Sequence, residues 1–187
     1  MDRCEYKSTV WTIFSLFSIT LLGLYYYGGK DDDFFAIVNN ITKAISINLV
    51  LLAIFIKWLW RLNIFRGWLV KIPNLNGEWS GKINTTYDGK KEIHINVLIN
   101  QTFLNTNICM SSDEMESNSF STSFFEDNGQ KKLCYSYISC PKANYREDSP
   151  IHMGTTILTF DSLTPTVLKG EYWTSRKTVG EIELSKT

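Results

Sequence analysis

Two histidines, His94 and His152, are the only imidazoles in the chain, and imidazole is the commonest acid–base group near neutral pH. Neither lies in a metal-binding spacing such as HExxH or beside a CxxC pair, and we expect both to be surface residues of strands. The serines and carboxylates form no G-x-S-x-G elbow and no phosphate loop. The sequence therefore predicts no catalytic residue, no metal site and no enzyme.

The cysteines also lack a reactive arrangement. Cys4, Cys109, Cys134 and Cys140 form no CxxC pair. Cys134 and Cys140 are expected on one strand, too far apart along it to form a disulfide. We expect reduced cytosolic thiols with packing roles.

Two apolar runs lie in the N-terminal part of the chain. Val10 to Tyr27 is uncharged over roughly 18 residues, or about 27 Å of helix, which is close to the thickness of a bilayer core. Ala44 to Leu62 contains Lys57, but its apolar residues favour insertion by about 4 kcal/mol, while a central lysine costs about 3 kcal/mol. Lys57 can also snorkel to the headgroups. We predict two spans, with interfacial or core helices as the alternative. The first run is longer than the 7 to 15 residues usual for the apolar region of a signal peptide.

Basic residues flank these runs unevenly. Arg3 and Lys7 precede the first run, and four more follow along the end of the second: Lys57, Arg61, Arg66 and Lys71. The connecting segment holds Lys30 and Lys43 beside Asp31 to Asp33. The positive-inside rule then predicts a multi-pass protein with a cytoplasmic N-terminus, a short external hairpin and a cytoplasmic C-terminal part.

Residues 72–187 alternate between polar and apolar positions, as β-strands do. Ile93 to Ile99 is the clearest case, preceded by an Asp88-Gly89 hairpin signal. We predict strands at 77–83, 93–99, 103–112, 118–126, 131–141, 151–162, 165–174 and 178–185. A sandwich is possible, but we favour an eight-stranded antiparallel up-and-down β-barrel, because closure removes exposed edges. The predicted fold is two N-terminal transmembrane α-helices, residues 1–71, followed by this all-β domain.

Charge argues against binding to nucleic-acid polymers. The whole chain is formally neutral, but residues 72–187 carry 11 Lys and Arg against 14 Asp and Glu. Affinity for DNA or RNA grows with the number of phosphates that basic residues neutralise. We therefore expect no DNA or RNA partner, although a local pocket could still hold one small anion.

The opening of the β-domain is a recognisable motif. Ile72 to Gly81 reads IPNLNGEWSG, a P-x-x-x-G-x-W-x-G pattern, while Gly170 to Trp173 and Thr178 to Ile182 close the domain. With two spans and a basic linker, the chain resembles the two-transmembrane β-barrel (S-2TMβ, SMODS-associated) effectors of bacterial cyclic-oligonucleotide-based anti-phage signalling, CBASS. The resemblance covers nearly the whole chain. It implies a barrel that binds a cyclic dinucleotide made by a partner nucleotidyltransferase, and helices that then oligomerise and disrupt the inner membrane in abortive infection.

A site for this ligand would need aromatic faces for the bases and donors for two phosphates. Tyr172 shares its strand parity with Leu168, so its ring should point inward. Arg176 lies in the turn before the last strand, where a guanidinium could reach a phosphate. The ligand-binding residues predicted on this resemblance are Trp79, Tyr87, Tyr172, Arg176 and Thr178. Trp79 could equally be a core residue, and Arg176 a solvated loop charge.

Two further segments could contribute. The connection from Pro141 to Pro150 could be a lid over the site or a mobile linker. In the spans, Thr12, Ser15 and Asn48 could make interhelical contacts in an assembly, or could be polar by chance.

Two functions therefore compete. The chain could be a membrane-disrupting effector activated by a cyclic dinucleotide, with no other cofactor. It could instead be a membrane-tethered barrel that binds a lipid or a protein and leaves the membrane intact.

Overall fold

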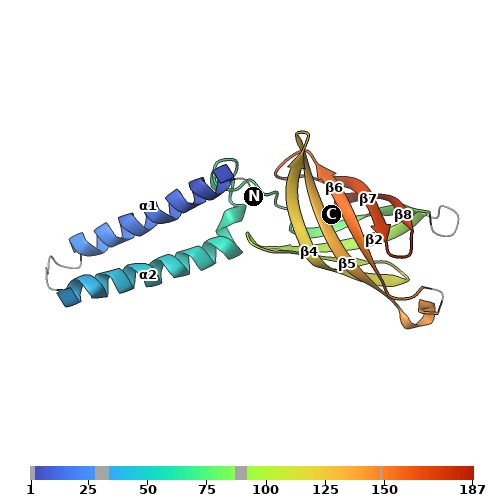
Figure 1. Cartoon of the computed structure of the whole chain (residues 1–187), viewed down its shortest axis with the longest axis horizontal. Coiled ribbons are helices and arrows are strands. Elements are labelled where there is room, and N and C mark those ends of the chain that lie inside the picture. The colour runs from blue at the N-terminus through green and yellow to red at the C-terminus, as the bar shows by residue number, and fades with distance from the viewer. Residues whose placement is uncertain (1–2, 28–33, 87–91, 148) are drawn as a thin grey trace. The chain divides into compact units, whose positions relative to one another are not determined.

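The computed structural model describes residues 3–27, 34–86, 92–147 and 149–187. The chain separates into two compact units, Met1–Lys71 and Ile72–Thr187 (Figure 1). The first unit is helical and the second is built from antiparallel strands.

The first unit contains two long helices. These are α1 (Arg3–Tyr27) and α2 (Phe34–Lys57), followed by two single 3₁₀ turns, η1 (Leu59–Arg61) and η2 (Asn63–Phe65). The predicted second span, Ala44 to Leu62, is therefore misplaced. The residues before Ala44 include neither glycine nor proline and continue the helix back to Phe34. At Trp58 the backbone leaves the helical region with a φ of −133°. Lys43, predicted in the connecting segment, thus lies inside α2.

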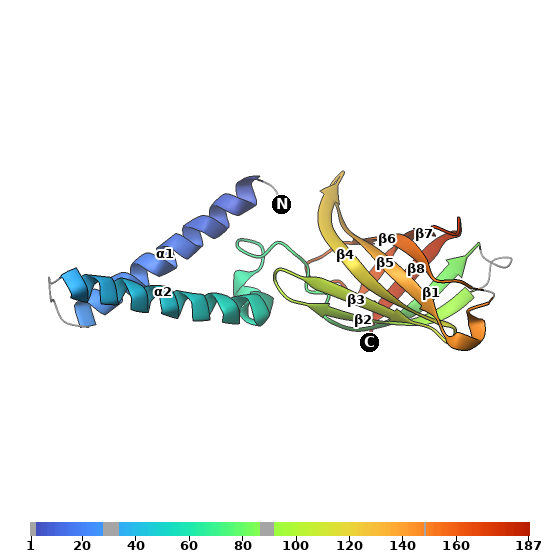
Figure 2. The same ribbon diagram turned by 60° about the horizontal axis from the view of Figure 1, so that its bottom comes forward.

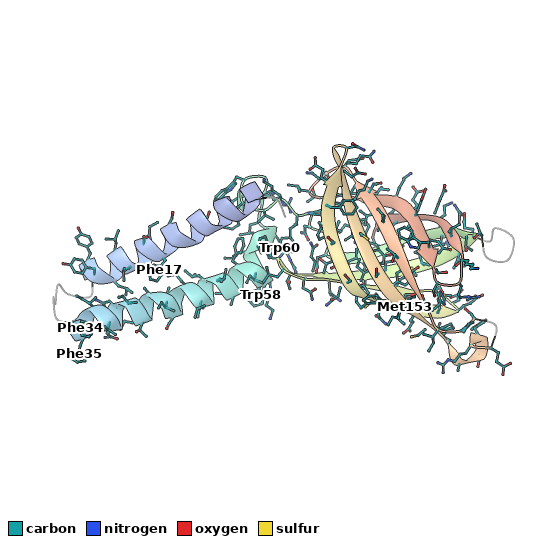
Figure 3. All side chains as sticks on the ribbon, viewed as in Figure 1. Phe17, Phe34, Phe35, Trp58, Trp60 and Met153 are labelled. Atoms are coloured by element: carbon teal, nitrogen blue, oxygen red, sulfur yellow. The ribbon has the colours of Figure 1, made fainter. Side chains whose placement is uncertain are left out.

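The apolar character of the two helices differs. Among the described residues, α2 is the one helix long and apolar enough to cross a membrane, whereas the apolar stretch of α1 is shorter, Ser15–Tyr26. Aromatic side chains mark both ends of α2, with Phe34 and Phe35 at its start and Trp58 just beyond its last residue (Figure 3). One candidate span is therefore supported, and a second span through α1 stays a prediction.

A polar contact joins α1 to α2. The Asn48 side-chain amide donates to Thr20 Oγ1 at 2.7 Å and to the Ala44 carbonyl at 2.8 Å, and Ala44 is fully buried. Asn48 was predicted to make interhelical contacts in an assembly of chains. In this structure its partner belongs to the same chain.

The second unit is a closed barrel of eight antiparallel strands in sequence order (Figures 1 and 2). They are β1 (Gly77–Thr85), β2 (Glu92–Gln101), β3 (Thr106–Ser111), β4 (Met115–Asp127), β5 (Gln130–Pro141), β6 (His152–Phe160), β7 (Val167–Thr174) and β8 (Val179–Lys186). Pairing of β1 with β8, with Ile83 opposite Ile182, closes the barrel. At Gly81 an added Cβ would overlap the carbonyl oxygen of Glu183, so glycine permits this closure. The predicted β-barrel is confirmed, and the predicted Asp88-Gly89 turn lies outside the described residues.

One end of the barrel is sealed by the segment that enters β1. Leu75 is fully buried, its backbone N–H donates to Gln101 Oε1 at 2.8 Å, and Gln101 Nε2 donates to the Pro73 carbonyl at 2.9 Å. Pro73, Leu75 and Gln101 form a plug at this end, and Trp79 packs beneath it. The indole N–H of Trp79 donates to the Leu75 carbonyl at 2.8 Å. The buried side chains of Leu75 and Trp79 therefore fill this end of the barrel.

Candidate ligand-binding site

A cavity of about 260 Å³ opens at the end of the barrel opposite the plug. It lies where β1, β5 and β7 end and where β2, β6 and β8 begin. Because side chains on a strand point alternately inward and outward, every second residue of these strand ends faces it. The residues that line it include Ile83, Thr85, Ile95, Met110, Met115, Tyr137, Ser139, Tyr145, Ser149, His152, Tyr172, Thr174, Arg176 and Thr178.

Tyrosine hydroxyls give the deeper part of the cavity its polarity. Tyr137 and Tyr172 are 5% and 8% exposed, and burial raises the pKa of both phenols. The hydrogen bond of Tyr172 with Thr85 acts in the opposite direction on its pKa. Both phenols are therefore neutral at physiological pH, able to donate and accept hydrogen bonds without carrying charge.

Two glycines make room for these rings. Tyr137 on β5 lies opposite Gly154 on β6, and Tyr172 on β7 lies opposite Gly180 on β8. A Cβ on Gly154 would overlap the hydroxyl oxygen of Tyr137, and one on Gly180 would lie 2.7 Å from Cε1 of Tyr172. Each ring therefore lies across a backbone that carries no side chain, and this pairing shapes the cavity.

Arg176 stands at the mouth of the cavity, in the turn between β7 and β8. Its backbone N–H donates to Thr174 Oγ1 at 3.2 Å, and its Nη1 donates to Ser149 Oγ at 2.6 Å. The hydroxyls of Thr174 and Thr178 lie 2.7 Å apart beside it. Among the described lining residues, Arg176 is the one permanent cation, with Glu114 also on the rim.

The connection between β5 and β6 borders the same mouth. Near its start, Lys142 Nζ donates to the Asp113 carbonyl at 2.8 Å, on the turn between β3 and β4. Near its end, Ser149 accepts the bond from Arg176. Between them, η3 (Ala143–Tyr145) brings Tyr145 to the rim. The connection thus borders the mouth near both of its ends, and its role as a lid stays a prediction.

The structure brings together three of the five predicted site residues. Tyr172, Arg176 and Thr178 all line the cavity. Trp79 does not, because it is 1% exposed beneath the plug at the other end of the barrel. Tyr87 lies outside the described residues.

Sequence reasoning missed other parts of the site. His152 was predicted to be a surface residue, but it is half-buried on the cavity wall, with Nδ1 2.9 Å from the Pro150 carbonyl. Ser149 was not singled out at all. The signal available was the inward parity of strand ends, which marks His152 but says nothing about a loop serine. By contrast His94 is exposed, as predicted.

The fold and the site define a class of protein: a closed β-barrel with a small cavity at one end, whose wall combines apolar side chains with hydroxyls and one guanidinium. Such a cavity suits a planar polar group that carries a negative charge. The chain belongs to the Cap15 cyclic dinucleotide receptor domain family, whose model matches residues 70–186. It is similar to the CD-NTase-associated protein 15 of Staphylococcus schleiferi, with 31% identity over 149 residues, which is 80% of each chain.

Proposed function

We propose that the barrel binds a cyclic dinucleotide at this cavity and that the chain is a membrane-anchored effector of CBASS anti-phage defence. The proposal is supported by membership of a cyclic dinucleotide receptor family and by similarity to a CD-NTase-associated protein. The structural observation that carries it is the placement of Arg176 at the mouth of a cavity lined by tyrosine hydroxyls.

The geometry suggests how the ligand would be held. One base would enter between Tyr137 and Tyr172, whose hydroxyls can donate to or accept from base edges. A phosphate would then lie at the mouth, where Arg176 can donate charge-assisted hydrogen bonds and Thr178 a neutral one. The residues expected to contact the ligand are thus Tyr137, Tyr172, Arg176 and Thr178.

The cavity is small for a cyclic dinucleotide, so its mouth would have to open when the ligand binds. Pockets that enclose a drug-sized ligand usually hold about 300 to 1,000 Å³, and this cavity of about 260 Å³ is smaller. Ser149 already occupies one donor of Arg176. A ligand phosphate would therefore displace Ser149, and the second base would remain outside the barrel or open the mouth further.

The helical unit supplies the proposed output. α2 would span the inner membrane and α1 would form a second span, with the N-terminus and the barrel in the cytoplasm. Ligand binding would drive oligomerisation of the chain, and the assembled helices would then disrupt the membrane. Two thin helices in one chain cannot open a bilayer, so damage requires several copies.

Calorimetry on the full chain in lipid nanodiscs tests the ligand. Cyclic di-AMP, cyclic di-GMP and cyclic GMP-AMP serve as probes, each with its linear dinucleotide as the matched control. We expect at least one cyclic form to bind more tightly than its linear counterpart, because cyclisation removes conformational freedom before binding. Equal or undetectable binding of all cyclic and linear pairs would contradict the proposed ligand class.

Dye release from vesicles carrying the full chain tests the output separately. We expect release only when the bound probe is present. Saturated barrels in intact vesicles would instead support the tethered barrel without membrane-disrupting activity.

A reporter fused after Thr187 tests the topology, and activity in its periplasmic form would contradict a cytoplasmic barrel.

A further inference from the structure

One face of α2 carries a group of polar side chains. Asn39, Thr42, Lys43 and Ser46 are all exposed in the structure. At 3.6 residues per turn they fall within an arc about 100° wide. The rest of the helix is dominated by Ile, Leu, Val, Phe and Ala, so this arc is a local exception on an apolar helix.

The polar face points away from α1. The side of α2 that packs on α1 is identified by Ala44, which is fully buried, and by Asn48, which donates to Thr20. These two positions lie roughly opposite the centre of the polar arc around the helix axis. The helical hairpin of one chain therefore leaves the polar face uncovered.

The polar face also lies deep within the candidate span. α2 has 24 residues, or about 36 Å, and its midpoint falls next to Ser46. Lys43 is therefore about 4 Å from the midpoint, unlike Lys57, which is the last residue of the helix and lies 4.6 Å from the Trp58 ring centroid. Lys57 can reach the headgroups, whereas Lys43 is placed near the centre of the hydrocarbon.

The four side chains differ in what they require. Thr42 donates to the Val38 carbonyl at 2.9 Å, and Ser46 to the Thr42 carbonyl at 2.9 Å, so both hydroxyls are satisfied within the helix. An ammonium needs water or an anion, and α2 contains no carboxylate. Charged residues inside spans almost always face a bundle interior or a water-filled cavity. Lys43 is thus the residue on this face that requires water or an anion beside it.

We propose that copies of this chain assemble with these α2 faces turned toward one another, so that they line a water-filled path that favours anions. The inference rests on the proposed membrane-disrupting function. Every copy inserts in the same orientation, which places the Lys43 side chains at one depth around a common axis. Like charges exclude a dry contact between them, so water must fill the space, and a ring of ammonium groups attracts anions.

Reversal potentials test this inference. The full chain is placed in planar bilayers under a potassium chloride gradient and activated with the cyclic dinucleotide that binds most tightly among the three probes above. We expect the wild-type current to favour chloride, and Lys43→Glu to reverse the preference to potassium. Lys57→Glu is the matched control, since it makes the same charge change at the end of the helix, and it should leave the chloride preference in place.

Vesicle flotation first establishes that each variant inserts, and Lys43→Gln serves as a second variant if Lys43→Glu does not. Lys43→Gln should lose the chloride preference while still conducting. Leakage with an unchanged ion preference in the inserted Lys43 variants would overturn the inference and leave the proposed function standing. Absence of any current with a saturated barrel would overturn the proposed membrane disruption and, with it, this path.

Discussion

The guanidinium of Arg176 donates a hydrogen bond to the hydroxyl of Ser149 at 2.6 Å, joining the turn between β7 and β8 to the connection between β5 and β6. The bond lies at the mouth of the cavity in which Tyr137 and Tyr172 are buried. A phosphate that binds Arg176 must compete with this serine. Recognition of the ligand and opening of the mouth are therefore coupled through one side chain.

Arg176→Ala should weaken binding of a cyclic dinucleotide by about 10- to 100-fold. The variant removes a charge-assisted contact worth about 1.5 to 3 kcal/mol. Calorimetry on the full chain measures the change, with Arg146→Ala as the control, because Arg146 is a nearby arginine that does not line the cavity. Equal affinity in folded Arg176→Ala and wild-type protein would remove Arg176 from the site.

Ser149→Ala should strengthen binding, by about 2- to 10-fold. The wild-type hydroxyl must give up its bond to Arg176 before a phosphate takes its place, and a bond of this kind contributes about 0.5 to 1.5 kcal/mol. The combination with Arg176→Ala is informative, since without the guanidinium the serine substitution should have no effect on affinity. A gain that persists in the double variant would show that Ser149 acts through something other than Arg176.

Gly154→Ala should destabilise the barrel by about 1 to 3 kcal/mol, because its Cβ would overlap the Tyr137 hydroxyl and overpacking has costs of this size. Urea unfolding measures the loss. In a double-mutant cycle with Tyr137→Leu, which shortens the opposing side chain, the alanine should cost much less. An equal loss of stability in both backgrounds would show that the alanine does not act through its contact with Tyr137.

Stability should fall as the pH rises above about 10. Burial raises the pKa of Tyr135 to about 12 from its ordinary value of 10.0, with a hydrogen bond to Thr156 acting the other way. The folded state then holds its proton over a range in which the unfolded chain loses it, so unfolding is favoured as pH rises from 10 to 12. Tyr135 alone accounts for about 2 kcal/mol of this loss by pH 11.5.

Urea unfolding at pH 8 and at pH 11.5 measures this loss. Tyr135→Phe should reduce the difference between the two pH values, and the rest should come from Tyr137 and Tyr172. A variant with the same pH dependence as the wild type would mean that Tyr135 ionises as readily in the folded barrel as in the unfolded chain.

Asn48→Leu should loosen α1 from α2 within a chain. Asn48 donates to Thr20 at 2.7 Å, and polar contacts between membrane helices average about 0.6 kcal/mol, with values up to about 1.7. A double-mutant cycle with Thr20→Val, read from thermal unfolding of the full chain in detergent, should show coupling of this size. Zero coupling would mean that the two side chains are independent.

The β-barrel was predictable from local sequence because strands have a period of two and turns have recognisable residues. The same parity predicted that Tyr172 points inward, and the position of Arg176 in a turn predicted that it stands at a mouth. These properties depend on neighbours in the chain. The sequence alone thus determined an all-β domain of antiparallel strands, the inward faces and part of the site, and it favoured a barrel over a sandwich.

Tertiary structure decided the rest. Trp79 and Tyr172 both point into the barrel, yet Leu75 and Gln101 plug the end that holds Trp79, and no local pattern reveals which end a distant segment seals. The pairing of Tyr137 with Gly154 depends on strand register, and the bond from Arg176 to Ser149 on where a loop comes to rest. Lys43 lies inside α2 because the helix extends beyond the apolar run, which begins only at Ala44. Hydropathy marks apolar blocks, whereas contacts between distant residues form only when the whole barrel closes.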